Sequence, residues 1–163
     1  MDPDTFAVTG IAEPLTRVSP ALGRLRLALA LPPVLLGAGA AAVAAIALDP
    51  RWWAAAGAAT LLAAWLAWLL PAQVRRMGWA EAPEELLLAR GRLWRTVTVV
   101  PYGRIQFVDV TAGPLQRALG IAELTVHTAS ATSDSRLRGI PAAQAHPLRE
   151  RLTGRARERL SGL

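Results

Sequence analysis

Two long runs of apolar residues dominate the first half of the chain. "LALALPPVLLGAGAAAVAAIAL" covers residues 27–48 and "WWAAAGAATLLAAWLAWLLPAQV" covers residues 52–74, and neither run contains a charged side chain. At about 1.5 Å per helical residue, each run reaches roughly 33 Å, which is enough to cross a ~30 Å hydrocarbon core. The pattern predicts an antiparallel transmembrane hairpin within residues 17–76, because the rest of the chain is too short to bury two such helices in a soluble core.

Small residues recur every four positions on both predicted spans. Such faces let two helices approach closely where lipid supplies no hydrophobic driving force. We expect them to pack the hairpin on itself, although they would also suit the spans of a partner. They are Gly37, Ala41 and Ala45 on the first span and Ala59, Ala63 and Ala67 on the second. Neither span contains an ionisable residue, so the pattern does not indicate a transporter or channel.

Basic residues flank the predicted hairpin at both of its ends, while its tip carries one arginine beside one aspartate. The positive-inside rule therefore places both termini in the cytoplasm and the tip on the outer side. In this orientation Trp68 and Trp79 lie towards the inner interface of the membrane. The flanking residues are Arg17, Arg24 and Arg26 before the first span and Arg75 and Arg76 after the second.

Residues 1–16 are expected to form a short flexible tail. Asp2 and Asp4 stand where a cleavable signal peptide has a basic region, and the first apolar run begins too late for such a signal. Apolar residues recur at three- and four-residue steps from Leu15 to Leu29, which indicates an interfacial helix leading into the first span.

After Arg76 the pattern changes to short runs that are rich in β-branched residues. "ELLLARGRLWRTVTVV" (85–100) predicts two strands joined at Gly91-Arg92. Further strands are predicted at 104–110, 122–129 and 135–140. From about Ala142 the apolar positions take a helical period. The apolar stripe of this helix consists of Ala145, Leu148, Leu152, Ala156, Leu160 and Leu163, and Arg151, Arg155 and Arg157 are expected to point away from it.

These elements define the expected fold class, an α+β membrane protein. A two-helix transmembrane hairpin is followed by a domain at 77–163, a small antiparallel β-barrel or bent sheet capped by the C-terminal amphipathic helix. A flat sheet of this size cannot bury one of its faces, whereas a bent sheet closed by a helix can.

Composition excludes several kinds of chemistry. The chain contains no cysteine, so a disulfide framework, a thiolate metal site and a cysteine nucleophile are all absent. His127 and His146 lack metal-ligand spacing, and no glycine-rich phosphate loop is present. The formal charge is +6 and every basic residue is an arginine. This preference is either suited to phosphate binding or, as we favour, the mark of a GC-rich genome. We expect no enzyme, no metal, no cofactor and no nucleic-acid partner.

The stretch "WRTVTVVPYGRIQFVDVTAGPLQRALGIAELTVHTAS", preceded by a two-helix hairpin, resembles the YdbS-like family of bacterial membrane proteins with a pleckstrin-homology-like (PH-like) domain. The resemblance covers roughly Val18 to Leu160 and is carried by Arg-Ile-Gln at 104–106 and Gln-Arg-x-Leu-Gly at 116–120. It implies a partly open seven-strand barrel with a C-terminal helix, a place in the bacterial inner (plasma) membrane, and no established enzymatic activity. It also makes a larger relative with several such domains the first candidate partner.

Two pairs of polar residues are candidate contacts with a partner protein. Arg104 and Gln106 either dock a partner or serve the fold, Arg104 by pairing with Asp109 or Glu123 and Gln106 by satisfying backbone groups.

Gln116 and Arg117 form the second pair, in a predicted helical turn that begins at Pro114 and ends at Gly120. Leu115 and Leu119, four residues apart, are expected to share the face that plugs one end of the barrel.

The loop that binds phosphoinositides in many PH domains corresponds here to "AEAPEEL", with Glu81, Glu84 and Glu85. These carboxylates would repel a phosphorylated headgroup. A basic strip that faces anionic lipid is the alternative lipid contact, and its expected members are Arg75, Arg76, Arg90, Arg92 and Arg95.

The leading functional expectation is a non-enzymatic membrane anchor that presents a PH-like module for protein assembly, with the larger relative or as a homo-oligomer. The alternative is a sensor of anionic lipid or membrane stress that uses the basic strip.

Overall fold

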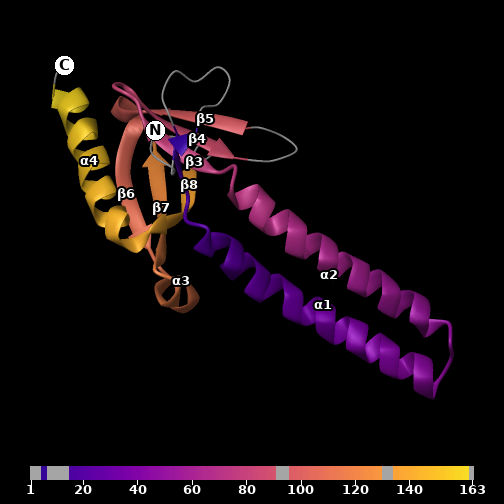
Figure 1. The fold of residues 1–163 in the computed structure, drawn as a ribbon. Coiled ribbons are helices and arrows are strands. Elements are labelled where there is room, and N and C mark those ends of the chain that lie inside the picture. Colours follow the sequence, from indigo (N-terminus) through magenta and orange to yellow (C-terminus); the bar gives the residue numbers. More distant parts are fainter. Residues whose placement is uncertain (1–4, 7–14, 91–95, 130–133, 162–163) are drawn as a thin grey trace.

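The computed structural model describes residues 5–6, 15–90, 96–129 and 134–161 (Figure 1). A long hairpin of two helices projects from a small domain of strands, and a C-terminal helix lies along that domain. The elements are β1 (Thr5–Phe6), β2 (Leu15–Arg17), α1 (Ala21–Ala47), α2 (Trp52–Val74), β3 (Gly78–Glu81), β4 (Glu85–Arg90), β5 (Thr96–Pro101), η1 (Tyr102–Arg104), β6 (Ile105–Thr111), α3 (Pro114–Ala118), β7 (Ile121–Thr128), β8 (Ser135–Pro141) and α4 (Ala142–Ser161).

The strands form two antiparallel sheets, with the orders β1-β2-β3-β4-β5 and β6-β7-β8. β5 and β6 are consecutive in the chain and are joined through η1, but they belong to different sheets. Among the described strands the barrel is therefore not closed. The predicted fold class is confirmed in its bent-sheet form, with two apolar helices, antiparallel sheets and a C-terminal helix.

The hairpin is inserted between two strands that pair with each other. β2 precedes α1 and β3 follows α2, and their register joins Thr16 to Trp79 and Arg17 to Gly78. Leu15 and Thr16, which we assigned to the flexible tail, are therefore part of the sheet, and the Leu15 side chain is completely buried. The segment begins as a strand and not as an interfacial helix, because it pairs with β3. β3 follows the whole hairpin in sequence, so the local pattern of apolar residues could not reveal this pairing.

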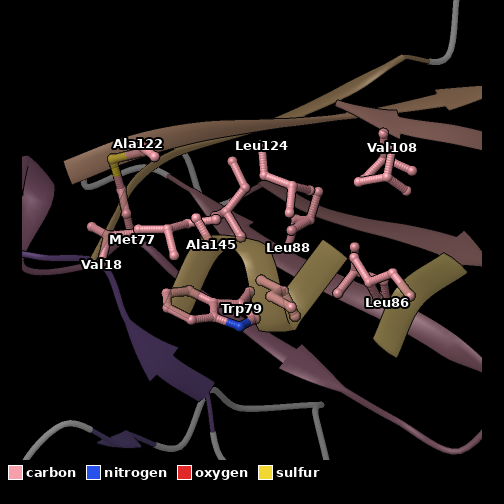
Figure 2. Packing of buried hydrophobic residues seen from close by; sticks show 14 of the residues in the cluster. Val18, Met77, Trp79, Leu86, Leu88, Val108, Ala122, Leu124 and Ala145 are labelled. Atoms are coloured by element: carbon pink, nitrogen blue, oxygen red, sulfur yellow. The ribbon is translucent and has the colours of Figure 1, made fainter. Parts of the chain in front are cut away.

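The base of the hairpin lies inside the core of the domain. Leu22 and Leu25 of α1, with Val74 at the end of α2, belong to the main hydrophobic cluster together with residues of both sheets and α4. Trp79, which we placed towards the membrane interface, is only 4% exposed and packs in this cluster (Figure 2). The sequence alone does not indicate whether a tryptophan that follows the spans faces lipid or protein. In the structure Trp79 lies on β3 and faces the protein core.

Two glycines allow the close approaches at this base. The position of a Cβ on Gly23 lies 3.4 Å from Cα of Pro71, so α1 and α2 are nearly in backbone contact there. Gly139 of β8 has φ of +82°, and a Cβ on it would lie 2.8 Å from Cβ of Leu22. A side chain at Gly139 would therefore be strained and would also collide with α1.

Away from this base, within the described part of the chain, the two helices pack mainly on each other. Both are long and apolar enough to cross a membrane. Large apolar side chains along them face outward, including Leu36 (74% exposed), Ile46 (78%) and Leu61 (74%). This exposure is opposite to that of core helices in a soluble protein, and it fits a lipid environment.

The small-residue faces are confirmed only in part. Ala45 and Ala63 are buried between the helices, and Ala41 and Ala59 are half-buried. Gly37 and Ala67 are exposed, so these two residues do not pack the hairpin on itself. A strict four-residue repeat drifts around a straight helix, because four residues exceed one 3.6-residue turn.

The strands predicted after the hairpin are present, and their boundaries within the described residues are shifted by one residue at most, while β1, β2 and β3 were not predicted. The apolar stripe of α4 is confirmed at Ala145, Leu148, Leu152 and Ala156, all at most 5% exposed. Leu160 and Leu163 lie outside the residues whose side chains the structure describes.

We predict that Gly139→Ala lowers the free energy of unfolding by about 2–4 kcal/mol, because the substitution adds left-handed backbone strain to a collision with Leu22. Denaturant unfolding of the full chain in mild detergent measures this. Gly103→Ala is the matched control, since its Cβ meets nothing within 4 Å and Gly103 lacks a positive φ. Equal stability of the two variants would contradict the packing of α1 against β8.

Candidate interaction surfaces

Two carboxylates at the β3–β4 connection, those of Glu81 and Glu84, are held by arginines of α4. Arg151 binds Glu81 with two nitrogens, Nη2 at 2.7 Å and Nε at 3.2 Å from Oε1. Arg155 Nη1 lies 3.8 Å from the other Glu81 oxygen, and Arg159 Nη2 lies 3.0 Å from Glu84. Arg151 and Arg155, which we expected to point away, instead reach past the stripe to the neighbouring strand. The loop therefore serves to fasten α4, and it presents no basic side chain to a phosphorylated headgroup.

Tyr102 of η1 is the buried centre of the same contact. Its hydroxyl donates to the Ala82 carbonyl at 3.0 Å and accepts from Arg155 Nη1 at 2.7 Å. Burial raises the pKa of Tyr102, and the hydrogen bond from Arg155 acts in the opposite direction. The neutral hydroxyl donor thus fixes the turn between the two sheets against the β3–β4 loop.

A groove with a volume of about 610 Å³ runs between β6 and α4. Gln106 and Phe107 line it from the strand, and Arg149, Glu150 and Gly154 line it from the helix. β6 pairs with β7 on one side, and no other described strand pairs with its second side. The groove thus follows a strand edge, and Gln106, one of the predicted contact residues, lies within it.

Arg104 is exposed, and its side chain has no hydrogen bond or ion pair with the described residues. The pairing considered for it does not occur, because both candidate acids have other partners. Glu123 accepts from Arg138 Nε at 3.2 Å, and Asp109 lies 3.6 Å from His127 Nε2. Neighbouring strands supply these partners, and the sequence separation does not reveal which strands are neighbours.

His127 is held on the outer face of the three-stranded sheet. Its ring stacks on Phe107 with the ring centroids 4.2 Å apart, and Nδ1 lies 2.8 Å from Asp134 Oδ2. Asp134 also accepts from the Thr128 amide at 3.3 Å, so the cluster ties the start of β8 to the end of β7. Within the described ranges, no group of three or more histidine and carboxylate side chains has an arrangement that could hold a metal ion.

The predicted turn at Pro114 is present as α3, and Gly120 beyond it has φ of +65°. Gln116 Oε1 accepts from the Gly113 amide at 2.7 Å, so this glutamine caps the helix. Arg117 is exposed and is the freer of the two predicted contact residues.

The prediction that Leu115 plugs the sheet is wrong, because this side chain is 53% exposed. Leu119 alone packs against the core. In a helix as short as α3, the direction of entry from β6 determines which side chain faces inward, and a four-residue spacing does not define that direction.

Three of the five arginines of the predicted basic strip lie in the described part of the chain. Arg75 and Arg76 are exposed at the end of α2, whereas Arg90 Nη2 donates to the Arg136 carbonyl of β8 at 2.6 Å. Arg92 and Arg95 lie outside the described residues.

These features together define a class of protein, a β domain closed by a C-terminal helix and rooted on an apolar helical hairpin. A comparison with protein families shows which family this is. Residues 23–156 match the family described as "Bacterial PH domain", and because the match spans most of the chain, the chain belongs to that family. No curated protein and no solved structure shows significant similarity to the chain.

Proposed function

We propose that this chain is a non-enzymatic membrane anchor whose PH-like domain assembles with another membrane protein through the groove between β6 and α4. The observation that carries the proposal is an open strand edge next to a groove, in a domain fixed to a membrane hairpin. The partner is a larger relative with several PH-like domains, as the YdbS-like resemblance implies, or a second copy of the chain.

The groove suits an extended peptide segment. A strand edge offers backbone N–H and C=O groups to an added strand, and side-chain pockets then supply specificity. Ile105 and Val108 give the groove an apolar part, while Phe107 at its border is 51% exposed. Arg149 and Arg157 outnumber Glu150 on the helix side. We therefore assign the site to a β-strand of the partner that carries apolar residues and at least one acidic residue.

The proposal includes the membrane orientation, with the hairpin tip outside and the domain with both termini in the cytoplasm. It rests on the arginines that flank the hairpin, since arginine-rich segments stay on the cytoplasmic side. Both ends of the hairpin enter the same domain, so that domain must lie on one side of the membrane.

Because the chain has no cysteine, single cysteines report this orientation directly. We expect Pro50→Cys at the tip to react with a membrane-impermeant maleimide in intact spheroplasts. Gln144→Cys, on the exposed side of α4 and outside the groove, should react only after the membrane is permeabilised. Labelling of Gln144→Cys alone in intact spheroplasts would contradict the proposed orientation, and labelling of both variants in intact spheroplasts would exclude membrane insertion.

The groove is tested by filling it from the helix side. Gly154 lines the groove and a Cβ there meets nothing within 4 Å, so Gly154→Leu is compatible with the fold and occupies the groove. We predict that Gly154→Leu lowers the amount of co-purified partner at least tenfold. The tagged chain is expressed at its native level, purified in gentle detergent and analysed by mass spectrometry.

Gly103→Leu is the matched control, because Gly103 also has open space around it and does not line the groove. It should recover as much partner as the unsubstituted chain, and that partner should be a membrane protein with PH-like domains or a second copy. Recovery of the unsubstituted chain only as a bare monomer contradicts the assembly function. Equal recovery with Gly154→Leu contradicts the groove as its site.

A further inference from the structure

Three arginines from distant parts of the chain meet at the foot of the hairpin. Arg26 lies on α1, Arg90 ends β4, and Arg138 lies on β8. Arg90 Nη2 reaches the carbonyl of Arg136, two residues from Arg138 on the same strand. Arg26 Nη2 lies 3.7 Å from Sδ of Met77, the residue just before β3. The sequence gives no signal of this arginine cluster, because its members are separated by long stretches of chain.

The three positive charges of the arginine cluster are compensated by too few negative charges. The charge of Arg138 acts repulsively on both Arg26 and Arg90. Partial desolvation lowers the pKa of Arg90, repulsion from Arg138 adds to this effect, and Glu123 opposes it. Glu123 is the single carboxylate that contacts the cluster, through its bond to Arg138 Nε at 3.2 Å, among the residues that the structure describes. Like charges held this way are unfavourable until an anion joins them.

The guanidinium of Arg26 has N–H groups that its hydrogen bond to Met77 does not use. A guanidinium carries five N–H groups, and a thioether sulfur is a weak acceptor. In the described part of the chain, the bond to Met77 is the one side-chain hydrogen bond of this half-buried residue. Its remaining N–H groups are therefore available to a phosphate, which guanidinium groups bind with two parallel hydrogen bonds.

The arginine cluster also lies where the uncharged part of the hairpin begins. Arg26 immediately precedes the uncharged run that begins at Leu27, and outward-facing apolar side chains begin at Leu29, which is 59% exposed. We propose that Arg26, Arg90 and Arg138 bind the phosphate of an anionic phospholipid in the cytoplasmic leaflet. This site shares Arg90 with the strip expected on sequence grounds, but its other members are Arg26 and Arg138. It rests on the membrane insertion proposed above and does not depend on the partner protein.

The site is tested with the full chain in non-ionic detergent by native mass spectrometry, which resolves the first bound lipid. Dioleoyl phosphatidylglycerol is the anionic probe and dioleoyl phosphatidylcholine the zwitterionic one. We expect phosphatidylglycerol to bind the unsubstituted chain at least tenfold more tightly than phosphatidylcholine does. Arg26→Gln should weaken phosphatidylglycerol binding at least tenfold, because the substitution removes charge-assisted hydrogen bonds to the phosphate as well as one charge. Arg90→Gln serves as a second, independent variant on another element.

Arg76→Gln is the matched control, because it removes the same charge next to the membrane but outside the arginine cluster. We expect it to change the affinity less than twofold. Equal losses in Arg26→Gln and Arg76→Gln would overturn the site in favour of diffuse attraction to the basic surface, as would equal binding of the two lipids by the unsubstituted chain.

Free phosphate is distinguished from a lipid headgroup in the same experiment. Inorganic phosphate and glycerol 3-phosphate, added at a tenfold excess over the lipid, should displace less than a fifth of the bound phosphatidylglycerol, because they lack acyl chains to pack on the hairpin. Full displacement would assign the arginine cluster to a soluble phosphate compound and overturn the lipid site. The cysteine-labelling experiment separately reports a failure of membrane insertion.

Discussion

The pairing of β2 with β3 is the constraint on which the rest of the structure depends. These strands stand on either side of the hairpin in sequence, and their register from Thr16–Trp79 to Arg17–Gly78 closes the hairpin at its base. Leu22 then packs against Gly139, and Val74 enters the same core. A hairpin rooted in this way is an extension of the domain, in contrast to a helix connected by a flexible linker.

This root determines what each face of the domain can meet. At the foot of the hairpin, α1, β4 and β8 bring together the three arginines that we propose as a binding site for lipid phosphate. Across the domain, α4 and β6 lie away from the hairpin, with the groove between them (Figure 1). The β3–β4 loop is engaged by Arg151 and Arg159, so its carboxylates are used within the fold. The arginine cluster and the groove thus consist of different residues, from different parts of the domain.

Features that repeat locally could be predicted from the sequence, and features that depend on distant pairing could not. The second span was predicted at the bounds that α2 has, and the buried stripe of α4 follows its helical period. β2, the burial of Trp79 and the outward position of Leu115 each depend on a neighbour that is remote in sequence or on the direction in which a short element leaves a strand. Gln106, which the sequence offered as a candidate partner contact, lines the groove, whereas Arg26 entered only as a flanking charge.

The distance between the hairpin and the domain tests the rooted hairpin most directly. Spin labels on Pro50→Cys at the tip and Thr111→Cys at the end of β6 report it by pulsed electron paramagnetic resonance, with the full chain in lipid nanodiscs. The account predicts one narrow distance distribution, which Gly139→Ala broadens by loosening the contact with α1. A broad distribution for the chain with Gly139 in place would show two bodies that move independently, and it would contradict the account.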